Sequence, residues 1–336
     1  MQAAFYGLAG LVLSPDERAF FKEAAPAGYI LFQRNCADRA QLKALTDDLR
    51  ALEGRDDLPI LIDQEGGRVA RLKPPAWPLF PAGEAFARLY AKAPMSAIEA
   101  ARANAGAIAA LLLECGVTVD ALPVLDVRRE DADDIVGDRA LGFEPMQVAA
   151  LGRALLDGLA EGGVVGIVKH MPGHGRALAD SHKELPVVGA SDAELAEDLA
   201  PFRALAAAPM GMVAHLVFTA WDAAAPASLS PIVIAEIIRG RIGFDGFLMT
   251  DDIGMHALSG DHGERTRRAL DAGNDAVLHC SGAMAEMEAV AAAARPLTQA
   301  AADRLARAMA SVRPPPAGAP GYAALADKRD RLLALA

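Results

Sequence analysis

The chain has 336 residues, of which 53% are hydrophobic and 23% charged, and its formal net charge is −11. This composition is that of a globular protein with a large core, and the acidic balance argues against nucleic acid or an anionic membrane as a partner. The three cysteines (Cys36, Cys115 and Cys280) are odd in number and far apart, which fits reduced thiols in a cytosolic protein better than a disulfide framework.

The first residues do not have the pattern of a signal peptide. No Lys or Arg precedes their apolar part, and acidic residues follow at once, so we expect a strand there. We also expect no apolar run long enough to span a bilayer. The sequence therefore predicts a cytoplasmic protein without a membrane partner, and we expect it to be a monomer.

Apolar runs typical of buried strands alternate along the chain with segments of helical periodicity. A Ser14–Glu17 capping box opens the first helix, and Ser230-Pro231 opens a later one. The predicted strands are residues 7–13, 28–32, 58–62, 116–120, 164–169, 211–215, 246–250 and 275–279. Eight such strands with helical crossovers predict a (β/α)8 TIM barrel, an α/β fold. An open doubly wound sheet is the alternative, but no G-x-G-x-x-G follows a strand.

The barrel is predicted as a single catalytic domain over residues 1–312. Residues 74–81 are rich in proline and are expected to be irregular, and residues 121–144 are predicted as loop. Beyond the barrel, residues 313–336 are predicted as a Pro-rich linker followed by a short C-terminal helix.

Titratable side chains stand at the ends of four predicted strands. They are Asp63, Lys169, His170, His215, Asp251 and Asp252. Because the strand C-termini of a barrel share one face, we expect these groups to form an active site. The loop after the fifth strand adds His174, Asp180 and His182, and so many titratable groups behind one buried strand favour function over backbone capping.

These residue types suit acid/base work combined with attack by a carboxylate. There is no Gly-x-Ser-x-Gly elbow, so acyl transfer is poorly supported. Asp63, Asp251, Asp180 and His182 supply acids and bases. Three cations have the donors to bind several hydroxyls at once, which suggests a polyol substrate with an acetal carbon: Arg71, Arg139 and Lys169.

Metal-assisted hydrolysis is the competing chemistry. Zinc in a barrel hydrolase would be held by carboxylates together with His170, His174, His182 and His215. No H-x-H or H-E-x-x-H pair is present, and the charge of Lys169 beside His170 would oppose a cation.

Seven motifs in one order resemble glycoside hydrolase family 3, in particular its single-domain bacterial β-N-acetylglucosaminidases of cell-wall recycling. The resemblance covers roughly residues 5–282. The motifs are I-L-F-x-R-N from Ile30, D-Q-E-G-G-R-V-x-R from Asp63, P-V-L-D-V from Pro123, G-D-R from Gly137, K-H-M-P-G-H-G from Lys169, D-S-H from Asp180 and T-D-D from Thr250. Met171 stands where the family usually has Phe, a conservative apolar change.

The resemblance implies a retaining mechanism without metal or cofactor. Asp251 would be the nucleophile, and His182 paired with Asp180 would be the general acid and base, in place of the usual second carboxylate. A neighbouring carboxylate orients an imidazole and keeps its protonated form accessible. The residues implied to bind the non-reducing sugar are Asp63, Arg71, Arg139, Lys169 and His170. The implied substrate is a muropeptide that ends in N-acetylglucosamine.

Several alternatives stay open. Glu65 is a second candidate acid, and Asp251 with Asp252 could act as a tandem pair, although side chains of successive strand residues point to opposite sides. We therefore interpret Asp252 as structural, and His174 as packing within its loop. A sugar-binding protein on an inactive barrel is disfavoured because Asp251, Asp180 and His182 are all present. The sequence separates neither hydrolase from phosphorylase nor muropeptides from chitin fragments.

Overall fold

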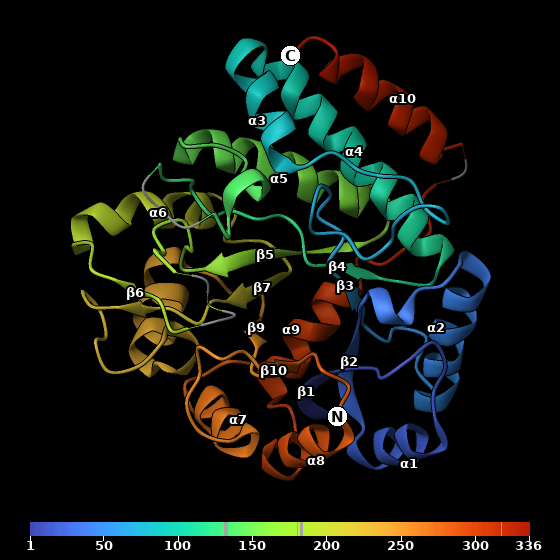
Figure 1. The fold of residues 1–336 in the computed structure, drawn as a ribbon, viewed down its shortest axis with the longest axis vertical. Helices are drawn as coiled ribbons and strands as arrows, with labels where there is room; N and C mark the ends of the chain where they lie inside the picture. The colour runs from blue at the N-terminus through green and yellow to red at the C-terminus, as the bar shows by residue number, and fades with distance from the viewer. Residues whose placement is uncertain (131–133, 180, 182–183, 317) are drawn as a thin grey trace.

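Eight parallel strands form a closed barrel (Figure 1). The computed structural model describes residues 1–130, 134–179, 181, 184–316 and 318–336. Around the barrel the strands follow the order β1-β10-β9-β7-β5-β4-β3-β2. Their bounds are Gln2–Gly7 (β1), Pro26–Leu31 (β2), Ile60–Ile62 (β3), Val119–Asp120 (β4), Val165–Met171 (β5), Met210–Val213 (β7), Phe247–Asp252 (β9) and Ala276–His279 (β10). The predicted (β/α)8 barrel is thereby confirmed.

Helices surround the barrel (Figure 1). They are α1 (Pro15–Ala24), α2 (Arg39–Glu53), α3 (Gly83–Lys92), α4 (Pro94–Glu114), α5 (Pro145–Glu161), α6 (Asp192–Ala204), α7 (His262–Asp271), α8 (Met284–Ala293), α9 (Gln299–Met309) and α10 (Tyr322–Leu333). The segment Val233–Ile242, predicted as the helix after Ser230, is a π-helix. Two short parallel strands, β6 (Val187–Val188) and β8 (Val217–Phe218), pair outside the barrel.

The core has two parts, because each barrel strand buries both of its faces. Inward-facing side chains such as Phe5, Ile167 and Phe247 fill the barrel, and α9 contributes Leu305 to the same cluster. A larger cluster lies between the strands and the surrounding helices. With the interior filled by side chains, the space for a ligand is restricted to the ends of the barrel.

The first strand differs from its prediction. Residues 7–13 were expected to form it, but β1 spans Gln2–Gly7 and pairs with β2 and β10. The apolar run continues past the strand, where Leu11 and Val12 are exposed at 42% and 72%. Hydrophobicity without alternation does not mark where a buried strand ends, which explains the shift.

Helix α4 corrects a second expectation. It has 21 residues and is long and apolar enough, by length and composition, to cross a membrane, and 67% of its most apolar window is buried inside the fold. It packs against α3, α5 and α10, as Figure 1 also shows. Its apolar faces are therefore the faces it presents to other helices.

The C-terminal segment returns to the barrel. Residues 313–316 and 318–321 carry no helix or strand, and α10 follows them as predicted. Arg329 is 5% exposed, donates from Nη1 to Asn104 Oδ1 of α4 at 3.2 Å, and lies over the ring of Phe80. Lys328 pairs with Glu99 of the same helix. These contacts join α10 to the outer layer, while the expected domain boundary at residue 312 stays a prediction.

Candidate active site

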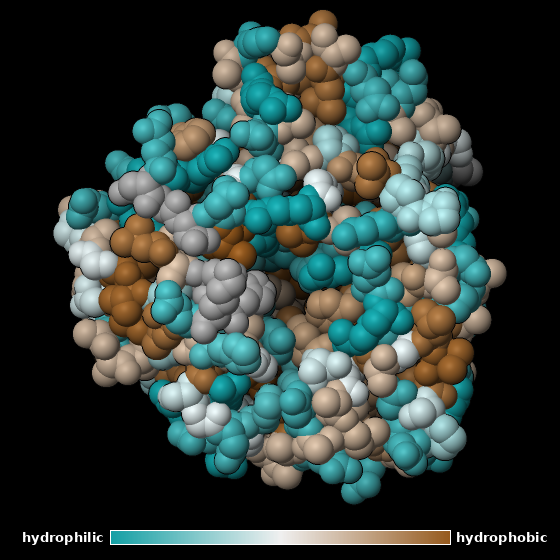
Figure 2. Space-filling model, in the orientation of Figure 1, coloured by the Kyte–Doolittle hydropathy of each residue, from teal (hydrophilic) through white to brown (hydrophobic). Residues whose placement is uncertain are grey.

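The C-terminal ends of the barrel strands surround a pocket of about 320 Å³. Figure 2 shows this face hollowed near its middle and rimmed by hydrophilic residues. The lining residues are Ile30, Phe32, Asp63, Glu65, Arg68, Val69, Arg71, Ile135, Arg139, Lys169, His170, Met212, Asp251, Asp252, Met255, Leu278 and Cys280. All five predicted sugar-binding residues and the predicted nucleophile are therefore gathered in one place.

A buried ion-pair network forms one wall of this pocket. Lys169 Nζ of β5 lies 2.9 Å from Asp63 Oδ1 and 2.7 Å from Glu65 Oε1. Arg71 Nη2 donates to the second oxygen of Asp63 at 2.9 Å. Arg139 binds Glu65 through two parallel hydrogen bonds of 2.9 and 2.8 Å. The Lys169 side chain is 2% exposed, so its charge is tolerable only because two carboxylates contact it.

The network holds its members ionised. Burial disfavours the charged carboxylate of Glu65, yet Arg139 and Lys169 outweigh burial and lower its pKa to about 2. Burial acts likewise on Asp63, where Lys169 and Arg71 hold the pKa well below its usual range. Burial opposes the charge of Lys169, but both carboxylates raise its pKa. A carboxyl group with a pKa of about 2 is a poor proton donor at neutral pH, which argues against Glu65 as the acid.

His170 is oriented by a residue that the sequence analysis did not select. Its Nδ1 lies 2.7 Å from Asp126 Oδ2 and its Nε2 lies 3.4 Å from Arg139 Nη2. Because arginine only donates, these partners fit an imidazole that donates from Nδ1 and leaves Nε2 as acceptor. Asp126 is fully buried and also accepts the backbone N–H groups of His170 and His174.

Asp126 is itself kept ionised. Burial opposes its charge, but His170, its closest partner, and His174 lower its pKa to about 2. It belongs to the P-V-L-D-V motif within residues predicted as loop, so only its position after an apolar run could have indicated it.

The end of β9 places two neighbouring carboxylates at the pocket. Asp251 and Asp252 both line it, and the expectation that only one of the two side chains acts in the site stays a prediction. The Asp252 carboxylate nevertheless accepts backbone N–H groups from Gly254 at 2.9 Å and Cys280 at 3.1 Å. These bonds agree with a structural role for Asp252, because they tie β9 to the end of β10.

The predicted acid/base pair lies outside the described residues. Because the structure describes neither Asp180 nor His182, their pairing stays a prediction. Of the same loop, His174 is buried, lies with Nε2 3.3 Å from Ser181 Oγ, and packs edge-on against His170. Burial lowers the pKa of His174 to about 4. These contacts agree with a packing role for His174.

The histidines considered for zinc have other partners. His170 faces Asp126 and Arg139, whereas His215 lies with Nδ1 2.7 Å from Ser228 Oγ and Nε2 3.0 Å from the Asp252 carbonyl. Within the described part of the chain, the group of His, Cys, Asp or Glu side chains with ligand atoms close enough to share an ion lies elsewhere, at His262, His279 and Glu286.

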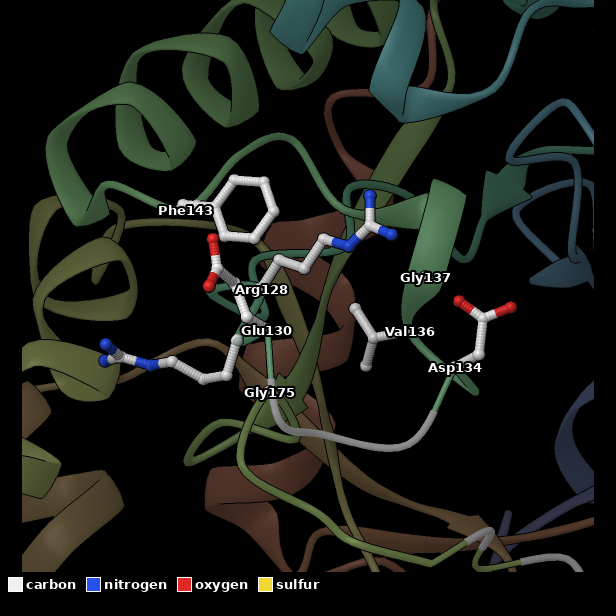
Figure 3. A pocket seen from close by; sticks show the side chains of 8 residues that line it. Arg128, Glu130, Asp134, Val136, Gly137, Phe143 and Gly175 are labelled. Atoms are coloured by element: carbon white, nitrogen blue, oxygen red, sulfur yellow. The ribbon is translucent and has the colours of Figure 1, made fainter.

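A second cavity, of about 270 Å³, is shown in Figure 3. Its lining residues are Arg128, Arg129, Glu130, Asp134, Val136, Gly137, Phe143 and Gly175. Two arginines of the first pocket donate to backbone carbonyls beside this cavity: Arg68 to those of Asp134 and Ile135, and Arg139 to that of Ile135. The two cavities therefore share the segment that ends at Arg139.

The fold and the pocket together define a (β/α)8-barrel enzyme whose site offers fixed donors and acceptors to a ligand at the strand ends. Residues 10–312 match the family described as the glycosyl hydrolase family 3 N terminal domain. The chain therefore belongs to glycosyl hydrolase family 3 and is a glycoside hydrolase, as the sequence motifs indicated.

Relatives cover most of the chain. It is 39% identical over 279 residues to a β-hexosaminidase of Aromatoleum aromaticum, a match covering 82% of this chain and 78% of that protein. It is 40% identical over 304 residues to a β-hexosaminidase of Xanthomonas campestris pv. campestris, covering 88% and 89%. The crystal structure of NagZ from Neisseria gonorrhoeae in complex with N-trifluoroacetyl-D-glucosamine has a TM-score of 0.86 and 32% identity, covering 99% of this chain and 98% of that one.

The buried network predicts an acid-dependent loss of stability carried by Glu65. Its pKa is lowered in the folded state, so its contribution is fully present above about pH 4.5 and disappears as pH falls toward 2. Glu65→Gln should destabilise the fold by about 3–5 kcal/mol at pH 7, because it leaves buried cations without a partner. The difference from wild type in urea unfolding should shrink as pH is lowered from 7 to 3.

Glu99→Gln is the matched control, since Glu99 forms an ion pair with Lys328 that is about half exposed. It should cost about 0–1 kcal/mol at neutral pH. A Glu65→Gln cost that is equally small, or that does not change with pH, would contradict the buried ion-pair interpretation.

Proposed function

We propose that the chain is a retaining exo-β-N-acetylglucosaminidase that removes terminal β-linked N-acetylglucosamine from muropeptides, namely GlcNAc-anhydro-MurNAc peptides. The family membership supports glycoside hydrolysis, and the β-hexosaminidase relatives support a hexosaminide as substrate. The NagZ complex with a trifluoroacetylated glucosamine supports the same sugar. We propose that the enzyme acts in the cytoplasm as a monomer and without a cofactor.

The observation that carries the proposal is the convergence of fixed polar groups in a pocket of about 320 Å³. Asp63, Arg139 and the neighbouring pair Lys169 and His170 come from three separate parts of the chain, and each of the four side chains is held by a partner on the protein. Hydroxyl groups both donate and accept, so a sugar ring matches a wall that presents both kinds of group. Groups held in place before the sugar binds lose little entropy when it does.

The chemical steps follow the retaining scheme. Asp251, at the end of β9, attacks the anomeric carbon and forms a glycosyl ester while the bond to the leaving oxygen breaks. His182 donates its proton to that oxygen. In the second step His182 takes a proton from water, which attacks the anomeric carbon and releases Asp251. Asp180 holds the imidazole and stabilises its charged form. The roles of Asp180 and His182 depend on the motif resemblance.

The wall of ion pairs has a separate task in this proposal. Asp63 and Arg139 bind sugar hydroxyls, and Lys169 keeps Asp63 ionised without needing to leave its buried position. Arg71, which lies over the Phe32 ring with its guanidinium carbon 5.0 Å from the centroid, adds a further donor at the rim. His170 adds an acceptor oriented by Asp126.

The cavity in Figure 3 is the proposed place for the leaving part of the substrate. It adjoins the first pocket through residues 134–139, and its lining includes two arginines. The Arg128 guanidinium lies 5.3 Å from the centroid of Phe143 and pairs with Glu84, whereas Arg129 pairs with Glu197 and Asp198. Glu130 and Asp134 line the same cavity and balance the two arginines, so the proposed preference for a peptide-bearing muramic acid over a chitin fragment depends on the motif resemblance and not on the charge of this cavity.

Turnover with and without phosphate tests the proposed function. An aryl β-N-acetylglucosaminide should be cleaved in phosphate-free buffer to free N-acetylglucosamine, much faster than the matching β-glucoside, and activity should survive exhaustive chelation. Identification of a sugar phosphate as the product would make the enzyme a phosphorylase, which a histidine acid/base tolerates better than a carboxylate. Loss of turnover on chelation with recovery on adding zinc would contradict the proposed chemistry.

The covalent step predicts that Asp251 is labelled. A 5-fluoro glycosyl donor with a good leaving group should trap an adduct, located by peptide mass spectrometry. Asp251→Ala should lower kcat/KM by several powers of ten, because acid assistance alone does not replace the missing attack. Asp252→Asn is the control, because the amide oxygen of asparagine can still accept the two backbone N–H groups that the Asp252 carboxylate accepts. This variant should still form the adduct on Asp251. An adduct on Asp63, Glu65 or Asp252 would refute the assignment.

The acid role predicts a leaving-group effect for His182. His182→Ala should slow substrates with poor leaving groups most, because an activated aryl group departs with little protonation. The slope of log kcat/KM against leaving-group pKa should therefore be much steeper than in the parent enzyme. Asp180→Asn should lower kcat with little effect on sugar affinity.

His174→Ala is the matched control for the histidine, because His174 lies in the same loop but packs against His170. It should leave the slope unchanged. A uniform loss with His182→Ala across all leaving groups, or a steep slope with Glu65→Gln, would mean that the acid is another residue.

A further inference from the structure

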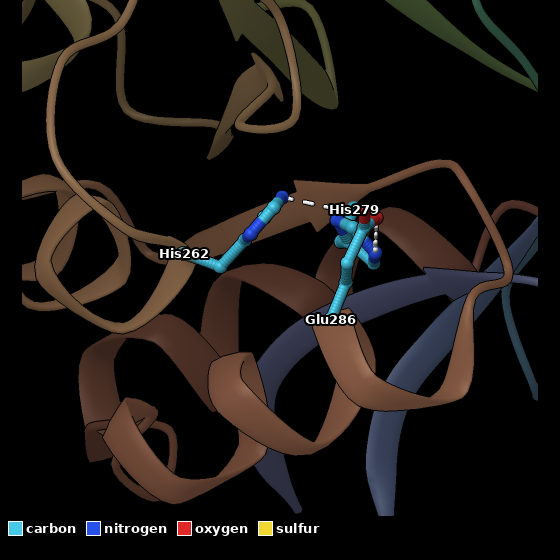
Figure 4. A group of neighbouring side chains, drawn as sticks. All are labelled: His262, His279 and Glu286. Carbon is cyan, nitrogen blue, oxygen red and sulfur yellow. Dashed lines mark ion pairs between the residues drawn. The ribbon is translucent and has the colours of Figure 1, made fainter.

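Two histidines and a glutamate meet on the outer side of the barrel, away from the sugar pocket. His262 is the first residue of α7, His279 is the last residue of β10, and Glu286 lies in the first turn of α8. Figure 4 shows the three side chains pointing toward one another. Successive strand side chains alternate between two sides, so His279 faces these helices while its neighbours Leu278 and Cys280 line the pocket.

The spacing of the side chains fits a shared metal ion. Glu286 Oε2 lies 3.4 Å from His279 Nε2 and 3.8 Å from His262 Nε2. One ligand atom from each residue lies within 4.8 Å of the others. Zinc binds nitrogen and oxygen at about 2.0–2.2 Å, so tetrahedral ligand atoms stand about 3.3 Å apart. Small side-chain rotations would bring the three ligand atoms, one from each residue, to that separation.

Burial adds a second observation. The His279 side chain is 0% exposed, whereas Glu286 and His262 are 39% and 24% exposed. Its Nδ1 has no hydrogen-bond partner in the part of the chain that is described. Its polar contacts are therefore all at Nε2, where Ser281 Oγ lies at 3.0 Å. The same hydroxyl donates to Glu286 at 2.5 Å. A buried imidazole that turns Nε2 toward a carboxylate, with two partly exposed neighbours, combines a fixed ligand with a path for entry.

We propose that His262, His279 and Glu286 form a binding site for a divalent transition-metal ion of the zinc type. Two neutral imidazoles and one carboxylate are a zinc ligand set, whereas calcium and magnesium prefer oxygen ligands alone. The Ser281 hydroxyl or a water molecule completes the tetrahedron. The site is structural, since it lies outside the sugar pocket and takes no part in the proposed hydrolysis.

The location gives the metal a mechanical role. It would join the N-terminal ends of α7 and α8 to the end of β10. The next residue of that strand end, Cys280, donates its backbone N–H to Asp252 beside the proposed nucleophile. Metal binding should therefore stabilise this side of the barrel without contacting the substrate.

Zinc titration of the full chain tests the site. Protein stripped with a chelator and then desalted is titrated with zinc chloride by calorimetry and followed in thermal unfolding. One equivalent should bind with a Kd in the micromolar range or tighter and raise Tm by several degrees. His262→Ala and Glu286→Gln should each weaken binding at least tenfold and remove most of the Tm rise. Both residues are partly exposed, so replacing them disturbs the core less than replacing the buried His279 would. If one variant fails to fold, zinc binding by the other decides whether the site exists.

His256→Ala is the matched control, because His256 is an exposed histidine that lies shortly before His262 in the chain and does not belong to the cluster. It should bind zinc as the parent does. Cobalt(II) should give the intense visible absorption of a low-coordinate site in the parent and the control, and lose it in the two cluster variants. Zinc binding that persists in both cluster variants, or no stoichiometric binding by the parent, would overturn the proposal. Neither result depends on turnover, so the proposed glycosidase function is tested separately.

Discussion

The pocket depends on the buried ammonium group of Lys169. An ammonium with 2% of its side chain exposed would lose several kcal/mol of hydration without partners, so its position requires both Asp63 and Glu65. Because Lys169 lies two residues before the end of β5 and the carboxylates follow β3, the charge pairing fixes how these strand ends stand relative to each other. Arg139 then binds Glu65 through two bonds and extends the network to the 134–139 segment.

This arrangement explains how a strongly charged pocket can bind a neutral sugar ring, as proposed here. Every ion in the wall already has a counter-ion, so the net field is small while donors and acceptors stay oriented. A sugar hydroxyl can bind at such a wall without an ion pair having to break. The Asp126–His170 contact also orients a polar group before the sugar binds. The buried carboxylate of Asp126 selects one tautomer of the His170 imidazole at the pocket. Specificity then depends on geometry rather than on net charge.

Much of the fold was predictable because a buried parallel strand produces an apolar run and each crossover produces a helix. The strand ends were predictable for the same reason, and they located Asp63, Lys169, His170 and Asp251. Precise bounds were not: β1 begins and ends earlier than its apolar run, since Leu11 and Val12 are apolar but exposed. Asp126 was missed because its role comes from a contact with His170, 44 residues away in the chain, which no local pattern encodes. The pairing partners of Lys169 were likewise invisible before the strands were brought together.

The central claim is that the ion-paired wall binds a single hexosamine ring. A crystal structure of the chain with N-acetylglucosamine tests it most directly. The account predicts one sugar in the pocket of about 320 Å³, with hydroxyls on Asp63, Arg139 and His170, the anomeric carbon facing Asp251, and the Lys169 contacts to both carboxylates unchanged. A sugar found instead in the cavity lined by Arg128 and Phe143, or one bound only after Lys169 has left Glu65, would contradict it.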